Sequence, residues 1–254
     1  MLSSILTIAQ TESRALFRGR IAIVFFFALP ALLSAILGPK VSGLDGPNVE
    51  GRTIIGFATL FSFMTVNYVG RALFREYVSH TWRRTAITKP PVLAYLVGKC
   101  SAVFALALVQ LFAFVLLSIS VTDLRFAHGT AVGLAQIWGV LVLHALCGVA
   151  VGALMFVFIK RAESFFSATY LALLAFATLG GSIVSSSELP SWSRWFGRFT
   201  PHHWTMRAVD EATIGNAEWA TVAESAAVLA GVSVALLVVT FWRFDYREEH
   251  FADA

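Results

Sequence analysis

The stretch Arg71–Lys99 reads RALFREYVSHTWRRTAITKPPVLAYLVGK and is the longest charged interval between two apolar runs of this chain. It carries six basic residues against a single acidic residue, Glu76. The segment Phe74–Ile87 is predicted to form a short helix that ends before Pro90 and Pro91, because proline lacks the amide hydrogen that a helix interior needs. A compact, cationic helix between two apolar runs suits a lever that receives force better than it suits a linker.

The composition is that of an integral membrane protein. The 254 residues are 57% hydrophobic and 13% charged, whereas a soluble globular chain is about 25% charged. The net charge of +4 does not indicate a nucleic-acid partner, since the cations lie between apolar runs, where membrane topology accounts for them. Cys100 and Cys147 both lie within apolar runs, so packed thiols are predicted rather than a disulfide. No linker or polar domain interrupts the chain, and residues 1–254 are predicted to form a single membrane domain.

Residues 1–20 precede the first apolar run and are predicted to form an amphipathic helix on the membrane surface. Apolar side chains recur at helical spacing at Leu2, Ile5, Leu6 and Ala9, and basic side chains follow them. A cleaved signal peptide is the alternative, but its charged region would be unusually long and no small-x-small cleavage site follows it.

Six uncharged runs come next, each near or above the roughly 18–20 residues that cross a hydrocarbon core as a helix. Long apolar runs in lipid must be helical, because no backbone group can be left there without a hydrogen bond. The predicted fold is therefore an all-α membrane protein with six transmembrane helices, over residues 21–39, 53–70, 101–122, 129–159, 164–187 and 225–242.

The distribution of cations sets the predicted orientation. Six spans place both ends of the chain on one side of the membrane, and the segments on that side hold thirteen of the 19 Lys and Arg residues. Cytoplasmic segments carry the excess of cations, so both termini and the Arg71–Lys99 stretch are predicted to be cytoplasmic in a multi-pass protein of the inner (plasma) membrane. The opposite side holds Lys40, Arg52, Arg125, Arg194, Arg198 and Arg207.

A second informative segment, residues 188–214, lies between the fifth and sixth predicted spans. The aromatic residues of its first half share one helical face, at Trp192, Trp195, Phe196 and Phe199. Thr200 and Pro201 suit the start of another helix, which is predicted to run past Trp204 to about Thr213. Two such helices predict a re-entrant helical hairpin that plugs the outer end of a pathway. A surface-lying loop with an aromatic belt is the alternative.

Few polar side chains lie within the predicted spans, and these are Asn67, Gln110, Gln136 and His144. Such residues usually hydrogen-bond between helices, and Asn67, Gln110 and His144 are also candidates for lining a pathway. No acidic residue lies mid-span, which argues against a proton-coupled transporter with an intramembrane carboxylate. Gly148 and Gly152 are spaced to let helix backbones approach closely, either within the chain or at a subunit contact.

The sequence carries no motif of an enzyme or a metal site. Gly98–Lys99 resembles the end of a phosphate-binding loop, but Leu93 stands where that loop needs glycine and Cys100 where it needs Ser or Thr. His202 and His203 are adjacent, so on a helix they point about 100° apart and make poor joint metal ligands. No cofactor is therefore expected in this chain.

Two motifs, taken together, resemble the permeases of type-2 ABC exporters. The loop after the second span is similar to that family's cytoplasmic loop at Arg75-Glu76, Thr81, Arg84, Pro90 and Gly98-Lys99. The outer segment is similar to the drug- and antibiotic-resistance branch at Leu189-Pro190, Trp192, Trp195, Thr200-Pro201, Trp204 and Arg207-Ala208. Within the loop, His80 stands where the family usually has glycine, and Thr85 stands where leucine is common.

The resemblance covers essentially the full length and implies the membrane subunit of an ATP-driven exporter. Two copies, or one copy and a paralogue, would form a dimeric efflux pathway for an amphiphilic or lipophilic drug or antibiotic. Two separate nucleotide-binding subunits would bind ATP and Mg²⁺ and dock on residues 74–89 and on the N-terminal helix, so this chain is not expected to be an enzyme. Contacts to that ATPase are expected at Glu76, Thr81, Arg83 and Arg84, for which a solvated face near anionic lipid is the alternative. The outer gate is expected at Trp192, Trp195, Phe196, Phe199, Pro201 and Trp204.

Three other functions compete with this one. The first is a permease of the same kind whose cargo is a lipid or a lipid-linked glycan, although the aromatic outer hairpin favours amphiphilic small molecules. A self-sufficient secondary transporter would usually show inverted repeats or broken spans with buried charges, which the sequence does not reveal. A non-transport membrane protein, such as an assembly factor or an enzyme, is the third, and a co-purifying ATPase subunit would argue against it.

Overall fold

The computed structural model describes residues 2–41, 48–122, 124–184, 188–213, 216 and 218–246. Within these residues the chain forms helices and no strand, so the predicted all-α fold is confirmed. The helices are α1 (Leu2–Arg18), α2 (Arg20–Val41), α3 (Val49–Ser62), α4 (Thr65–Val78), α5 (Trp82–Thr88), α6 (Val92–Thr122), α7 (Thr130–Phe158), α8 (Ala162–Leu179), α9 (Ser191–Gly197), α10 (Pro201–Thr213) and α11 (Trp219–Arg243). The cation Arg247, residues 185–187 of the fifth predicted span and residue 214 of the predicted hairpin lie outside the described residues.

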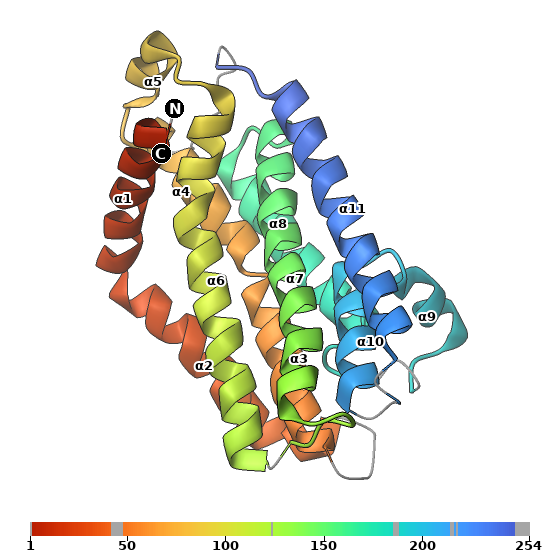
Figure 1. Ribbon diagram of the computed structural model, residues 1–254. Helices are drawn as coiled ribbons and strands as arrows, with labels where there is room; N and C mark the ends of the chain where they lie inside the picture. The colour runs from red at the N-terminus through yellow and green to blue at the C-terminus, as the bar shows by residue number, and fades with distance from the viewer. Residues whose placement is uncertain are drawn as a thin grey trace.

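The long helices lie side by side in a bundle with two distinct ends (Figure 1). The start of α1, the short helix α5 and the last turns of α11 lie together at one end, which is called the α5 end below. The connection between α6 and α7 lies at the opposite end, and α9 and α10 lie in that half of the bundle, beside α11. The Tyr246 hydroxyl donates a hydrogen bond to the Pro90 carbonyl at 2.6 Å, which fixes the segment after α11 at the α5 end.

Helical segments that are long and apolar enough to cross a membrane are Val49–Val78, Val92–Thr122, Thr130–Phe158, Ala162–Leu179 and Trp219–Arg243, five within the described residues. They correspond to the second to sixth predicted spans. The first predicted span is α2, in which the described apolar helix covers only Phe26–Ile36, so the sixth crossing stays a prediction. The fifth span ends at Leu179, earlier than predicted, because Gly180 caps it and Gly181 follows with a φ of +82°.

The second span is interrupted at Phe63 and Met64, where α3 ends and α4 begins. The amides of Met64 and Val66 bond carbonyls three residues back instead of the four of a regular α-helix. Beside the interruption, the Thr59 carbonyl accepts a hydrogen bond from the His144 ring at 3.1 Å. A side chain that inserts into the backbone ladder is a common cause of such a break. The step is local: Val49–Val78 is still one helical segment long enough to cross a membrane, so the second predicted span is confirmed with an irregularity that the sequence did not reveal.

Two clusters of buried side chains form most of the core. Towards the α5 end, the Phe74 ring packs edge-on against Phe156 and Phe165, with ring centroids 5.0 and 5.4 Å apart. Gly148 and Gly152 of α7 pack against the α3–α4 junction and the start of α4, so the close approach that they permit is used within the chain. The second cluster joins α3, α6, α7 and α10 and includes Ile55, Leu111, Leu141 and Met206.

The segment predicted as one helix over residues 74–87 is two helices, so that prediction is wrong. The transmembrane helix α4 runs on to Val78, and α5 is a separate helix over Trp82–Thr88. The predicted stop is confirmed, because Lys89 takes a left-handed backbone conformation with a φ of +38° and Pro90 follows it.

The break between α4 and α5 is a C-terminal cap of the Schellman type. The Thr81 amide donates to the Glu76 carbonyl at 2.9 Å, and the His80 amide donates to the Tyr77 carbonyl at 3.1 Å. His80 itself has a φ of +55°, at the position of this motif that glycine usually occupies. The glycine that the resemblance led us to expect at position 80 would therefore have marked the end of α4.

Candidate coupling site at the α5 end of the bundle

Helix α5 is fastened to the bundle by one aromatic side chain, Trp82, which is buried. Its ring stacks on Tyr77 at a centroid distance of 4.5 Å and lies nearly parallel to Tyr246 at 6.1 Å. Burial, together with the nearby Glu76 carboxylate, raises the pKa of Tyr246 to about 12. The Tyr246 hydroxyl therefore stays protonated and keeps its hydrogen bond to Pro90. These contacts join α5 to α4 and to the segment that follows α11.

The other face of α5 points away from the bundle. Three of the four predicted ATPase contacts, Thr81, Arg83 and Arg84, are exposed on it or just before it. Ile87 lies one turn after Arg83 and Arg84 and is 83% exposed, the largest exposure among the large apolar side chains of the described residues. The free face of α5 thus combines two cations with an apolar side chain, as protein-binding surfaces often do.

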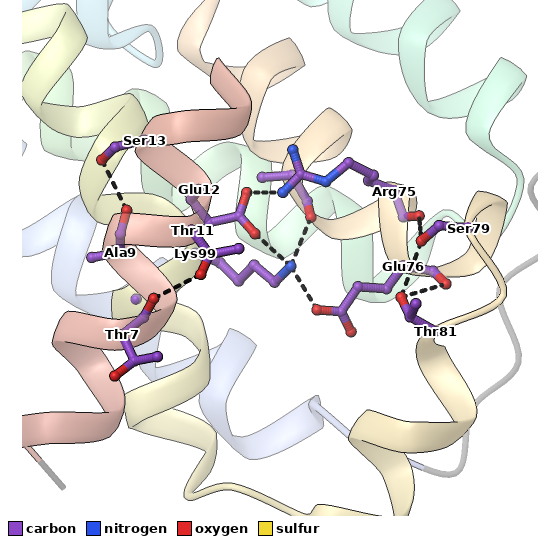
Figure 2. Close-up of polar contacts among 12 residues, drawn as sticks. Thr7, Ala9, Thr11, Glu12, Ser13, Arg75, Glu76, Ser79, Thr81 and Lys99 are labelled. Atoms are coloured by element: carbon purple, nitrogen blue, oxygen red, sulfur yellow. Dashed lines mark hydrogen bonds and ion pairs between the residues drawn. The ribbon is translucent and has the colours of Figure 1, made fainter. Parts of the chain in front are cut away.

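Behind α5, four charged side chains from three helices form an ion network centred on the buried Lys99 (Figure 2). Lys99 of α6 lies between two carboxylates, with its Nζ 2.7 Å from Glu12 Oε1 and 2.6 Å from Glu76 Oε1. Arg75 of α4 pairs with the second oxygen of Glu12. Lys99 also donates to the Ala72 carbonyl at 3.3 Å. Because a buried charge is costly unless it is paired, this network ties α1, α4 and α6 together directly behind the α5 surface.

Glu76, the fourth predicted ATPase contact, turns inward to Lys99 and takes part in this network instead of the exposed face. Sequence reasoning missed Glu12, the only acidic residue among the first twenty. Glu12 follows Ile5 and Ile8 on the side of α1 that packs against α6, and its side chain is 5% exposed. A lone carboxylate on the apolar side of an amphipathic helix was the signal that it has a buried partner. Whether α1 lies on a membrane surface stays a prediction.

A branched side chain at position 80 is expected to destabilise the junction between α4 and α5. The left-handed conformation of His80 costs about 1–2 kcal/mol for residues with a Cβ, and most for β-branched ones. His80→Val should therefore lower the free energy of unfolding by about 1 kcal/mol, measured by SDS-induced unfolding in mixed micelles. His80→Gly should not lower the free energy of unfolding, and His80→Asn should have a free energy of unfolding close to that of wild type. If valine and glycine gave equal stability, the left-handed conformation of residue 80 would be refuted.

At the other end of the bundle, α9 presents the predicted aromatic face. The four aromatic side chains of this face, three in α9 and one just after it, are each more than half exposed: Trp192, Trp195, Phe196 and Phe199. Helix α10 begins at Pro201 and ends at Thr213, as predicted. The Trp204 indole donates to the Arg198 carbonyl at 2.8 Å, which joins the two helices. A re-entrant position of this pair in a membrane stays a prediction.

Helix α10 is held to α3 by an ion pair that sequence reasoning missed, in which the arginine is buried and the Asp210 side chain is 28% exposed. The fully buried Arg52 guanidinium bonds Asp210 twice, with Nε 2.6 Å and one terminal nitrogen 3.2 Å from the two carboxylate oxygens. The same terminal nitrogen donates to the Gly181 carbonyl at 2.9 Å. The second span was predicted to begin at residue 53, one residue after Arg52, whereas α3 begins at Val49 and includes Arg52.

The three candidate pathway residues bridge helices. His144 of α7 bonds the Thr205 hydroxyl of α10 at 2.9 Å besides the Thr59 carbonyl. Gln110 of α6 donates to the Phe26 carbonyl of α2 at 3.2 Å, and Asn67 of α4 accepts from Thr169 of α8 at 2.7 Å. All three are buried, and a pathway-lining role for them stays a prediction. Nowhere in the described ranges do three His, Cys, Asp or Glu residues gather as a metal site would require.

Comparison with known proteins agrees with this architecture. The family model described as ABC-2 family transporter protein matches residues 45–242, which reach from just before α3 to the last turn of α11. No curated protein matches the chain. Since the matched region covers more than half of the chain and contains the helices long enough to span a membrane, the chain is a multi-pass membrane protein that belongs to the ABC-2 family of transporter proteins.

Proposed function

We propose that this chain is the membrane subunit of an ATP-driven exporter and that its cargo is an amphiphilic or lipophilic small molecule, such as a drug or antibiotic. Two copies, or one copy and a paralogue, enclose the pathway. Two separate ATPase subunits bind ATP and Mg²⁺ and act on the α5 end. Membership of the ABC-2 family supports the permease role, and the exposed aromatic face of α9 supports an amphiphilic cargo.

The observation that carries the proposal is that one face of α5 is cationic and exposed while the other face is packed against the bundle. Arg83, Arg84 and Ile87 are accessible to a partner, while Trp82 is packed between Tyr77 and Tyr246. A push on α5 therefore reaches α4 and the end of α11 directly. It reaches α6 and α1 through the ion network behind it. A helix joined so broadly moves several spans together, which is how rigid elements carry a change from one site to another.

The proposed orientation of the protein in the membrane rests on the distribution of Lys and Arg residues. The segments gathered at the α5 end carry most of the Lys and Arg residues, and cytoplasmic segments hold this excess. The α5 end therefore faces the cytoplasm, where ATP is available, and the aromatic helix α9 faces outward. In this arrangement α9 and α10 close the outer end of the pathway as a re-entrant hairpin, at the opposite end from the site on which the ATPase acts.

The test is a double charge reversal, Arg83→Glu with Arg84→Glu, in the complex of this chain with the ATPase subunit that co-purifies with it. Both side chains are exposed, so the variant should insert and fold normally. Loss of two interface cations should weaken the ATPase complex by about tenfold or more and should reduce ATPase stimulation and vesicle transport together. The measurement is ATPase activity and uptake into inverted vesicles.

The matched control is Arg194→Glu with Arg198→Glu, two exposed cations at the α9 end. This variant has the same change in charge but should bind the ATPase as wild type does. Equal ATPase stimulation in wild type and in the α5 variant would refute docking on α5. Transport driven by an ion gradient in the isolated chain, without any ATPase, would refute the exporter assignment and favour a secondary transporter.

A further inference from the structure

A half-open cavity of about 360 Å³ lies at the corner between α1 and α2. Its floor is formed by the end of α1 at Leu16 and Gly19, and its walls by α4, α6 and α8. Most of the lining is apolar, with Phe74, Val103 and Phe166 among the wall residues. A cavity of this size and character accommodates part of a hydrocarbon chain.

One rim of the cavity is cationic. Arg71 and Arg75 both line it and lie one turn apart on α4, so their side chains leave the same face of the helix. The Arg75 side chain is 40% exposed while it is paired with Glu12, so part of it stays accessible to a ligand. Arg71 is exposed and forms no ion pair with any residue that the structure describes.

The charges around this rim do not balance. Two of the charged side chains that line the cavity are cations, Arg71 and Arg75, and one is a carboxylate, Glu12, which Lys99 also engages. One positive charge is therefore left over, next to an apolar cavity. Guanidinium groups bind phosphate through paired hydrogen bonds, and two of them on one face form a suitable clamp.

We infer that this cavity binds an anionic phospholipid of the cytoplasmic leaflet. The lipid phosphate lies between Arg71 and the open side of Arg75, and one acyl chain lies along the apolar wall. This inference goes beyond the proposed function and uses from it only the placement of the α5 end on the cytoplasmic side. The bound lipid completes the charge balance of the ion network and fills the gap between the α1–α2 corner and α4. It thereby holds α1 in contact with α4.

The experiment is native mass spectrometry of the full chain, titrated with phosphatidylglycerol or with phosphatidylcholine of the same acyl chains. Wild type should retain phosphatidylglycerol in preference to phosphatidylcholine. Arg71→Gln should weaken phosphatidylglycerol binding about tenfold, the loss expected for a charge-assisted hydrogen bond. Arg71→Lys should keep part of the affinity. Arg83→Gln, an exposed cation outside this cavity, should bind as wild type does.

A second variant tests the apolar wall without altering charge. Ala102→Leu adds volume to the cavity lining and should reduce phosphatidylglycerol binding, whereas inorganic phosphate should compete poorly with the lipid in every variant. Equal losses in Arg71→Gln and Arg83→Gln would refute the site, since they would indicate general attraction to the basic surface. Full competition by inorganic phosphate, with no effect of Ala102→Leu, would also refute it, since the site would then bind a free anion. Lipid binding is read without the ATPase, so its outcome is independent of the test on α5.

Discussion

Asp210→Ala is expected to destabilise the protein by about 3–5 kcal/mol, because it leaves the Arg52 guanidinium buried without its counter-charge. Arg52 is fully buried, and Asp210 is its only carboxylate partner among the described residues. The Gly181 carbonyl would remain as an acceptor but carries no full charge. The loss should appear as a lower SDS fraction at the midpoint of unfolding in mixed micelles, with α10 released from α3.

Two further variants separate the charge effect from the loss of a side chain. Arg52→Met combined with Asp210→Ala removes both charges and should recover most of the stability, since replacing a buried pair with apolar groups is often nearly neutral. Glu224→Ala removes one partner of the Arg207–Glu224 pair, which is more than one-third exposed on both sides, and should cost less than about 1 kcal/mol. Similar losses from Asp210→Ala and Glu224→Ala would show that Arg52 is not buried.

Lys99→Met is expected to have an effect of similar size at the opposite end of the bundle. The side chains of Lys99 and Glu12 are each 5% exposed, and that of Glu76 is 14% exposed. Without Lys99, Glu76 loses its cation and Glu12 keeps only the partly exposed Arg75, at a cost of about 3–5 kcal/mol. Because Glu12 belongs to α1, this helix should detach first. SDS-induced unfolding measures the loss, and limited proteolysis within α1 locates it.

The control for this change is Lys89→Met, which removes the same side chain from an exposed position at the end of α5. It should leave both stability and the protease resistance of α1 unchanged. Combining Lys99→Met with Glu12→Gln removes one of the two carboxylates and should restore part of the stability. Protection of α1 in Lys99→Met equal to that in wild type would contradict the role of this network in holding α1.

Much of the helical architecture follows from the sequence because length and apolarity decide it. Each of the second to sixth predicted spans has a helical counterpart, since runs such as 101–122 leave the backbone no alternative in lipid. Local signals also sufficed where the chemistry is local, as at the proline that begins α10 and the prolines that follow α5.

The contacts that hold the site together could not be predicted, because they join residues far apart in the chain. Arg52 and Asp210 are 158 residues apart, and Glu12 and Lys99 are 87 apart. Counting cations assumes that an arginine beside an apolar run faces water, whereas Arg52 is buried. The sequence also showed neither the 3₁₀ step within the second span nor a buried charge, and the structure contains both. These features alone suit a secondary transporter as well, and membership of the ABC-2 family is what favours a permease.

The interruption at Phe63 and Met64 divides the second span into two halves, α3 and α4, which are held by different parts of the molecule. The half that carries Arg75 and Glu76 is anchored among the charges near α5, while the half that carries Arg52 is anchored to α10. A straight helix would transmit an axial thrust unchanged from one face of the membrane to the other. A stretch of 3₁₀-type bonds midway along a helix is a point at which the helix bends more readily, so the two halves can tilt against each other. The His144 bond to the Thr59 carbonyl therefore ties α7 to the second span close to the point at which that span bends most readily.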